Sequence, residues 1–266
     1  MQKPGQGRRA RPRSAISQYC RNAHCSRIVR ETRLAVTGAT EVYRALCAPE
    51  GQRVGGYEIA TRVVPARHVS GDFVCSVQCK QGTFLVLADL MGKGLSAAMW
   101  LTHIIDLVHR AADESQNVSE LLGHLNQEVL HSRISAPLTS AIAILIGERE
   151  GRISCALAGH PPAVILRKAG AETITAGGPL LGVLSSAIYE SQDVYLERGE
   201  SLIAFSDGLS EAAAHEKFSM DNVLTAIAQD AESAPAETIS KLLKRSTTFS
   251  SEAPLDDISI LVLQRR

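Results

Sequence analysis

The 266-residue chain is 45% hydrophobic, and its 28 basic and 28 acidic side chains give a formal net charge of zero. This length and apolar content allow one large domain or two small ones. No apolar run approaches the roughly 20 residues that cross a bilayer, and the basic start is not followed by the apolar segment of a signal peptide. We therefore expect a cytoplasmic protein without a membrane partner.

The net charge hides an asymmetry, because residues 1–30 contain eight Lys or Arg side chains and no acidic side chain. A basic arm of this kind can contact nucleic acid, an acidic partner or a membrane surface. Its Pro, Gly, Gln and Arg content favours a solvated, disordered segment. The six cysteines show neither a disulfide framework nor a second ligand pair at zinc spacing, so we expect them to be reduced.

Hydrophobic periodicity predicts strands and helices in an irregular order. In chain order we expect a helix at 31–47, strands at 57–64, 73–79 and 83–88, helices at 95–112 and 119–131, strands at 138–147, 152–158 and 163–167, a loop at 177–182, strands at 191–196 and 201–206, helices at 219–229 and 235–246, and a strand at 258–264. Short polar gaps such as residues 80–82 indicate antiparallel hairpins. The pattern predicts one α+β domain of two packed sheets flanked by helices.

Two details of the helical segments can be predicted from the same pattern. Ser119 is the expected N-cap of the helix that follows it. Met91, Met99 and Trp100 lie beside or within the helix that starts near residue 95, and we expect them to pack that helix against a sheet.

Five aspartates lie where predicted strands begin or end. Asp72 precedes the strand at 73–79, Asp89 follows that at 83–88, Asp207 follows that at 201–206, and Asp256 and Asp257 precede the last strand. If these strand ends lie side by side, the carboxylates repel one another, and hard divalent cations relieve the repulsion. Any one of these residues could be an ordinary turn former. Together they predict a binuclear Mg²⁺ or Mn²⁺ site for hydrolysis.

Six short motifs follow one another along the chain, and four of them contain these aspartates. They are Ser70–Phe73 (SGDF), Ala88–Ala98 (ADLMGKGLSAA), Ala158–Pro162 (AGHPP), Pro179–Gly182 (PLLG), Ser206–Glu211 (SDGLSE) and Asp256–Ile260 (DDISI). In this order the motifs resemble those of the metal-dependent (type 2C, PPM) protein serine/threonine phosphatases, in particular the bacterial SpoIIE/RsbU-like branch. The resemblance covers residues 31–266 and implies a four-layer α-β-β-α sandwich of two mainly antiparallel sheets, with a metal centre at one edge.

The resemblance also implies a role for each aspartate. The implied ligands are Asp89 as the bridge between two Mn²⁺ or Mg²⁺ ions, the Leu90 carbonyl on one ion, Asp207 and Asp256 on the second ion, and Asp72 on metal-bound water. A metal-bridging hydroxide would attack the phosphorus of phosphoserine or phosphothreonine in line, which makes Asp89 and Asp207 the catalytic residues. Asp257 is expected to hold a turn or to support a ligand.

Other positions near the motifs have weaker expectations. Arg62, Arg67 and Lys93 are candidates for binding the substrate phosphate. Cys75 stands where the family's common GGDFYD motif, here SGDFVC, has a second carboxylate. We expect His160 to have a structural role, with its ring hydrogen-bonded to the backbone.

The resemblance further implies partners and a domain plan. Usual substrates in this branch are small phosphorylated regulators, notably anti-sigma-factor antagonists. We expect a basic arm at 1–30, a linker helix at 31–50 and a phosphatase domain at 51–266, with regulation by an activating partner protein or by a homodimer through residues 31–47. Two other functions stay open: a catalytically weak module that sequesters a phosphoprotein, and a two-metal phosphodiesterase or nuclease. The basic residues lie outside the domain, which argues against nucleic acid as a partner.

Overall fold

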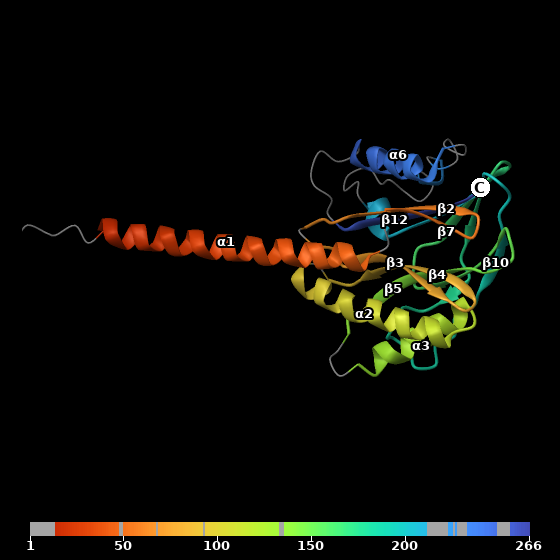
Figure 1. Cartoon of the computed structure of the whole chain (residues 1–266), viewed down its shortest axis with the longest axis horizontal. Coiled ribbons are helices and arrows are strands. Elements are labelled where there is room, and N and C mark those ends of the chain that lie inside the picture. Colours follow the sequence, from red (N-terminus) through yellow and green to blue (C-terminus); the bar gives the residue numbers. More distant parts are fainter. Residues whose placement is uncertain are drawn as a thin grey trace, which may run out of the picture.

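Two six-stranded sheets pack face to face, and helices cover their outer sides (Figure 1). The structure is a computed structural model that describes residues 14–47, 50–67, 69–92, 94–132, 136–211, 223–225, 227, 233–248 and 256–266. The layers run helix, sheet, sheet, helix. This arrangement confirms the α+β sandwich that the sequence predicted.

Almost every neighbouring pair of strands is antiparallel. The first sheet contains, in spatial order, β1 (Gly51–Val54), β2 (Tyr57–Val64), β12 (Ile258–Arg265), β11 (Ser201–Phe205), β7 (Ala163–Arg167) and β8 (Gly170–Ile174). The second sheet contains β10 (Gln192–Tyr195), β6 (Arg152–Ala158), β5 (Thr139–Ile146), β4 (Gly82–Leu90) and β3 (Asp72–Cys79), with the short β9 (Gly177–Gly178) parallel to β6. The short strands β1, β8 and β9 were not predicted, because glycine interrupts or begins each of these segments.

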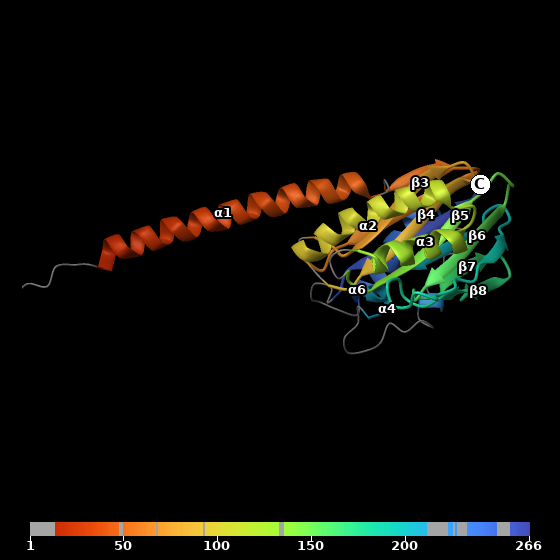
Figure 2. The same cartoon turned by 90° about the horizontal axis from the view of Figure 1, so that it is seen from below.

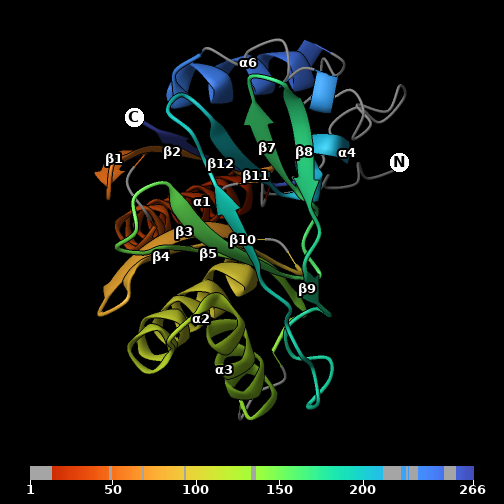
Figure 3. The same ribbon diagram turned by 90° about the vertical axis from the view of Figure 1, so that its right-hand side faces the viewer.

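Three apolar cores separate the four layers. Helices α2 (Leu95–Glu114) and α3 (Val118–Leu130) lie on the second sheet, and α6 (Pro235–Thr248) lies on the first (Figure 3). The middle core lies between the sheets and is formed by side chains from both of them. A strand with both faces buried reads as a continuous apolar run, which is why β12 was easy to predict.

Helix α1 (Ser14–Leu46) extends away from the sandwich (Figures 1 and 2). It begins at Ser14 rather than near residue 31, because the Pro and Gly residues that indicated disorder end at Pro12 and helix-compatible residues follow. Residues 1–13 lie outside the described residues, so the disordered arm stays a prediction there. In the part of the chain that the structure describes, no helix is both long enough and apolar enough to cross a membrane.

Some details of the helices differ from the predictions. Asn117, not Ser119, caps α3: its side chain accepts a hydrogen bond from the Glu120 amide at 2.9 Å, and the Glu120 carboxylate accepts one from the Gln116 amide at 2.7 Å. The predicted helix at 219–229 lies mostly outside the described residues, although residues 223–225 and 227 are helical.

The prediction that Met91 and Met99 belong to the core was wrong. Their exposed fractions are 63% and 68%. Met91 lies in the turn after β4, and Met99 lies on the outer side of α2, whereas Ala97, Ala98 and Leu101 are buried. Trp100 is partly buried against the core between α2 and the second sheet, in line with its prediction.

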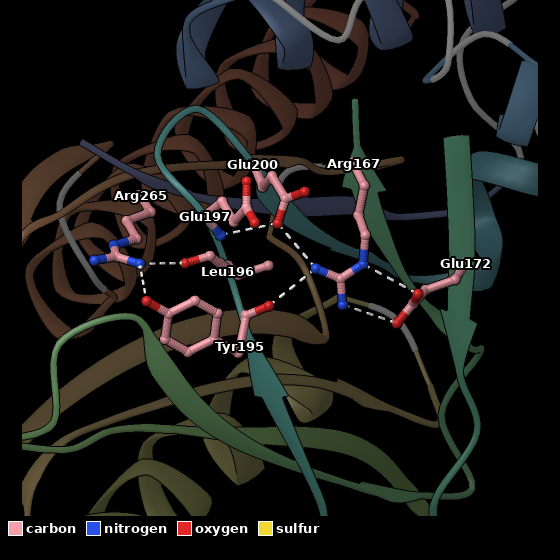
Figure 4. A network of polar contacts seen from close by, with 7 residues as sticks. All are labelled: Arg167, Glu172, Tyr195, Leu196, Glu197, Glu200 and Arg265. Atoms are coloured by element: carbon pink, nitrogen blue, oxygen red, sulfur yellow. Dashed lines mark hydrogen bonds and ion pairs between the residues drawn. The ribbon is translucent and has the colours of Figure 1, made fainter. Parts of the chain in front are cut away.

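A polar network closes one end of the strands (Figure 4). Arg167 donates hydrogen bonds to Glu172 at 3.1 Å through two nitrogens, to Glu200 at 2.9 Å and to the Tyr195 carbonyl at 2.9 Å. Arg265 donates to the Leu196 carbonyl at 2.7 Å and to the Tyr195 hydroxyl at 3.0 Å. Arg167 and Arg265 end β7 and β12, Glu200 precedes β11, Glu172 lies in β8 and Tyr195 ends β10, so the network joins strands of both sheets.

Candidate metal centre

The hairpin of β3 and β4 brings two of the predicted carboxylates together. Asp72 is paired with Asp89 directly across the strands. The Cβ atoms of such pairs lie about 4.5–5.5 Å apart. Side chains alternate along a strand, so both carboxylates lie on the face where Val74 and Leu87 join the core between the sheets. The turn at residues 80–82 sets this register, which places two like charges side by side.

Two further predicted ligands come from the first sheet. Asp207 follows β11 and opens the short helix α4 (Asp207–Glu211), and Asp256 lies just before β12. β11 ends where β12 begins, because the two strands are antiparallel and Phe205 is paired with Ile260. The hairpin of the second sheet and the β11–β12 edge of the first therefore supply carboxylates from two sides.

A pocket of about 610 Å³ lies where these carboxylates meet. It is lined by Asp89, Leu90, Met91, Gly92, Leu138, Ser140, Gly159, His160, Pro161, Leu180, Asp207, Asp256 and Asp257. Four of these residues are aspartates, and no Lys or Arg among the described residues lines the pocket. Asp72 is not part of the lining: it is 2% exposed and lies beside Asp89.

Asp257 holds the loop that leads to Asp72. Its two carboxylate oxygens accept hydrogen bonds from the Ala66 amide at 2.7 Å, the Ser70 hydroxyl at 2.8 Å and the Gly71 amide at 2.8 Å. The Ser70 hydroxyl oxygen in turn accepts a hydrogen bond from the Asp72 amide at 2.9 Å. Asp257 thus fixes a turn, the kind of role that its sequence position indicated.

Two other residues support the site from outside the pocket. A Cβ atom at Gly208 would lie 2.0 Å from the Asp257 carbonyl oxygen, so only glycine lets the start of α4 approach β12 this closely. The Tyr43 hydroxyl donates a hydrogen bond to the Asp72 carbonyl at 2.8 Å, which joins α1 to the start of β3. Sequence reasoning missed this contact, although Tyr43 belongs to the amphipathic pattern of the predicted helix.

Burial and mutual repulsion disfavour the charged forms of Asp72 and Asp89. Burial, followed by the charge of Asp89, raises the pKa of Asp72 well above its usual range. Burial, followed by the charge of Asp207, raises the pKa of Asp89 to about 6. The Oδ2 atom of Asp72 is buried and accepts no hydrogen bond within the described residues. Carboxylates in this state are stabilised by a nearby cation.

The donor set fits Mg²⁺ or Mn²⁺. These hard cations prefer carboxylate, carbonyl and water oxygens, and Mg²⁺ is commonly held by one or two carboxylates while it keeps several waters. Across the described ranges, no three His, Cys, Asp or Glu side chains are close enough to enclose an ion by themselves. Water molecules would therefore complete the coordination, and the water-holding role of Asp72 stays a prediction.

The remaining sequence candidates lie in different places. The His160 Nδ1 donates to the Pro161 carbonyl at 3.0 Å, and burial lowers the pKa of His160 to about 4, so its ring is hydrogen-bonded to the backbone as predicted. Arg62 bonds to Glu50 at 2.6 Å, and neither Arg62 nor Arg67 lines the pocket. Cys75 packs in the core beneath α2 and α3 rather than beside the carboxylates. Lys93 lies outside the described residues.

A comparison with protein families matches residues 80–266 to the stage II sporulation protein E (SpoIIE) model. The chain belongs to the SpoIIE family. Membership confirms the resemblance to PPM-type serine/threonine phosphatases that the ordered motifs indicated. The matched region contains Asp89, Asp207 and Asp256, whereas Asp72 precedes it.

Individual relatives agree with the SpoIIE assignment. Phosphoserine phosphatase RsbU of Bacillus subtilis (strain 168) is 24% identical over 242 residues, which are 90% of this chain and 72% of RsbU. The SiaA-PP2C domain of Pseudomonas aeruginosa superposes with a TM-score of 0.77 at 17% identity, covering 90% of this chain and 98% of that domain. RsbX, solved in complex with magnesium, superposes with a TM-score of 0.60 at 15% identity, covering 81% of this chain and 98% of RsbX. The two solved structures share the sandwich fold with this chain.

Proposed function

We propose that this protein hydrolyses phosphoserine or phosphothreonine on a regulatory protein with the help of divalent cations. The observation that carries the proposal is the meeting of carboxylates from two sheets at one pocket, where burial and repulsion raise the pKa of Asp89. A self-repelling cluster of this kind is expected where cations are part of the chemistry. RsbU, named a phosphoserine phosphatase, supports the choice of substrate group.

The residues divide into those that would hold cations and those that would hold the ligands in place. The proposed ligands are Asp89, the Leu90 carbonyl, Asp207 and Asp256, with Asp72 holding water, for two Mn²⁺ or Mg²⁺ ions. When bound, the cations would lower the pKa of an attacking water and neutralise the phosphoryl oxygens. Asp257 keeps the loop before Asp72 in position through its three hydrogen bonds. The partly buried Asp89 carboxylate would supply negative charge to the cations.

The expected substrate is a small phosphorylated regulator, such as an anti-sigma-factor antagonist. The family assignment supports this class of partner. A two-metal phosphodiesterase acting on nucleic acid fits less well, because the described part of the pocket lining contains no basic side chain that would contact a phosphate backbone.

We further propose that α1 joins two copies of the chain. Val29, Thr32, Val36, Ala39 and Tyr43 follow one another at steps of three or four residues, the spacing of a coiled-coil seam. Ala39 and Tyr43 pack against the domain core, whereas Val29 is exposed. The exposed part of this stripe fits a second copy of α1. Light scattering after gel filtration is expected to show a dimer that Val29→Asp converts to monomers. A monomeric wild type would contradict the proposal and direct attention to a separate activating partner.

One assay tests the phosphatase function. Wild type is expected to hydrolyse p-nitrophenyl phosphate and a phosphoserine peptide only with Mn²⁺ or Mg²⁺ present. Asp89→Asn should lower kcat by at least about 100-fold, the order expected when one key charge of an active site is lost. The matched control is Asp106→Asn, an exposed aspartate on α2 that pairs with Arg110 away from the pocket.

Each alternative predicts a different outcome in this assay. Hydrolysis that does not depend on Asp89 would contradict the proposed metal centre. Binding of the phosphopeptide without turnover by wild type would favour a sequestering module, and cleavage of a phosphodiester in preference to the monoester would favour a phosphodiesterase.

A further inference from the structure

Exposed apolar side chains lie at one side of the carboxylate pocket and on the segment that continues from its lining residue Leu180. We name them the apolar rim: Met91 (63% exposed), Leu138 (36%), Val183 (44%) and Leu184 (51%). Met91 and Leu138 also line the pocket, together with Leu180. Single exposed apolar side chains are ordinary on a protein surface, whereas a group of them beside a functional pocket marks an interaction site.

Backbone hydrogen bonds place the segments of the rim side by side. The Met91 amide donates to the Leu138 carbonyl at 2.8 Å, and the Leu181 amide donates to the Thr139 carbonyl at 3.0 Å. Hydrogen-bonded extended segments lie about 4.8 Å apart. The end of β4, the start of β5 and the segment from Leu180 therefore form three adjacent rows next to the carboxylates.

A buried asparagine fixes the third row. The Asn126 side chain accepts a hydrogen bond from the Gly182 amide and donates one to the Leu184 carbonyl, each at 2.9 Å. Gln127, next on α3, donates to the Ser185 carbonyl at 2.7 Å. The backbone that presents Val183 and Leu184 is already held in place. Little conformational entropy is therefore lost in this segment when a partner covers the two side chains.

We propose that the apolar rim docks the protein substrate and selects apolar side chains next to the phosphorylated residue. The proposal rests on the phosphatase function proposed above. The rim is continuous with the pocket, so a phosphoresidue that enters the pocket brings its neighbours across Met91 and Leu138. No Lys or Arg from the described part of the chain lines the pocket, so acidic flanking residues would find no basic partner there.

The test compares two phosphoserine peptides of equal length and net charge. One has Leu and Val beside the phosphoserine, and the other has Gln and Ser there. We expect kcat/KM to be about tenfold higher for the apolar peptide, mainly through KM, which is the size expected from burying one or two apolar side chains. The double variant Val183→Gln/Leu184→Gln should remove this preference. Met99→Gln, which changes an exposed methionine outside the pocket lining, is the matched control and should keep it.

A binding measurement separates the two proposals. Fluorescence anisotropy with the Asp89→Asn protein reports peptide affinity whether or not turnover occurs. If wild type hydrolyses neither peptide nor p-nitrophenyl phosphate, the phosphatase function fails, while the rim is still tested by affinity. Equal affinities for the two peptides, or a preference that persists in the double variant, would overturn the docking proposal.

Discussion

Strands β7, β11 and β12 have opposite charge arrangements at their two ends. At one end, Asp72 and Asp89 face each other, and Asp207 and Asp256 approach from the first sheet. At the other end, Arg167 bonds to Glu172 and Glu200 (Figure 4). The first end gathers charges of one sign, whereas the second compensates each buried charge with its opposite.

This difference teaches where stability and function are located in the sandwich. The compensated end fixes the strands with hydrogen bonds that require no ligand. The carboxylate end raises the free energy of the metal-free fold, and a cation that binds the native state but not the unfolded chain would offset that increase. Four substitutions in the metal-free protein test this contrast, each measured as the free energy of unfolding in urea with EDTA.

The largest effect is expected for Arg167→Ala. Its removal leaves Glu200, which is 6% exposed, without its guanidinium partner. Loss of one partner of a buried ion pair costs about 3 kcal/mol, because the remaining charge is buried and uncompensated. Arg167→Lys keeps the charge but not the two-nitrogen contact with Glu172. Its free energy of unfolding should therefore lie between those of wild type and Arg167→Ala. A loss below about 1 kcal/mol, the range of exposed ion pairs, would show that this end is not compensated as described.

Asp89→Asn is expected to act in the opposite direction and to stabilise the metal-free protein. Its pKa of about 6 shows that the fold disfavours the charged carboxylate. One pKa unit corresponds to about 1.4 kcal/mol, so the rise from 3.8 to about 6 sets an upper limit of about 3 kcal/mol on the gain at pH 8. Addition of Mn²⁺ should reverse the order, because wild type then gains the binding energy.

The gain from Asp89→Asn should depend on pH in one direction. Because folding raises this pKa, the folded state binds the proton more tightly than the unfolded state. The loss of stability caused by the charged Asp89 is absent when the pH lies below the usual pKa of 3.8. It grows as the pH rises to about 6 and is constant at higher pH. The difference in free energy of unfolding between Asp89→Asn and wild type should depend on pH in the same way. A difference that is constant from pH 4 to 7 would contradict the repulsion.

Asp257→Asn should destabilise the protein by about 1–2 kcal/mol, the range for loss of hydrogen bonds to a buried charged acceptor. An asparagine can accept at only one of the two oxygen positions that now serve Ala66, Ser70 and Gly71. Asp257 and Asp89 line the same pocket, yet their substitutions should change stability with opposite signs. A stabilising effect of Asp257→Asn would place it among the repelling carboxylates instead.

The smallest effect is expected for Arg152→Ala. Its bond to Asp193 is short, at 2.6 Å, but both side chains are about half exposed. Exposed ion pairs contribute less than about 1 kcal/mol, because water solvates the remaining carboxylate when its partner is removed. A loss as large as that of Arg167→Ala would show that burial does not decide the strength of these pairs.

The sequence was informative where local pattern determines structure. The aspartates could be placed at strand ends because apolar runs define β4, β11 and β12, and the tight turn before β4 fixes the register of Asp72 and Asp89. The network around Arg167 could not be predicted, because its partners come from three segments and one of them, Tyr195, belongs to the other sheet. Met91 was misplaced because an apolar residue beside a helix looks like core until the turn is seen to expose it.

The position of β12 in the first sheet also bears on how the chain is made. It lies between β2 and β11, and its residue Ile258 is paired with Val64. During synthesis, β2 leaves the ribosome long before β12 is made, and pairings between such distant segments form slowly. The strand that completes the sheet also positions Asp256 at its start. A nascent chain therefore completes the first sheet and gains the full set of proposed ligands in the same late step.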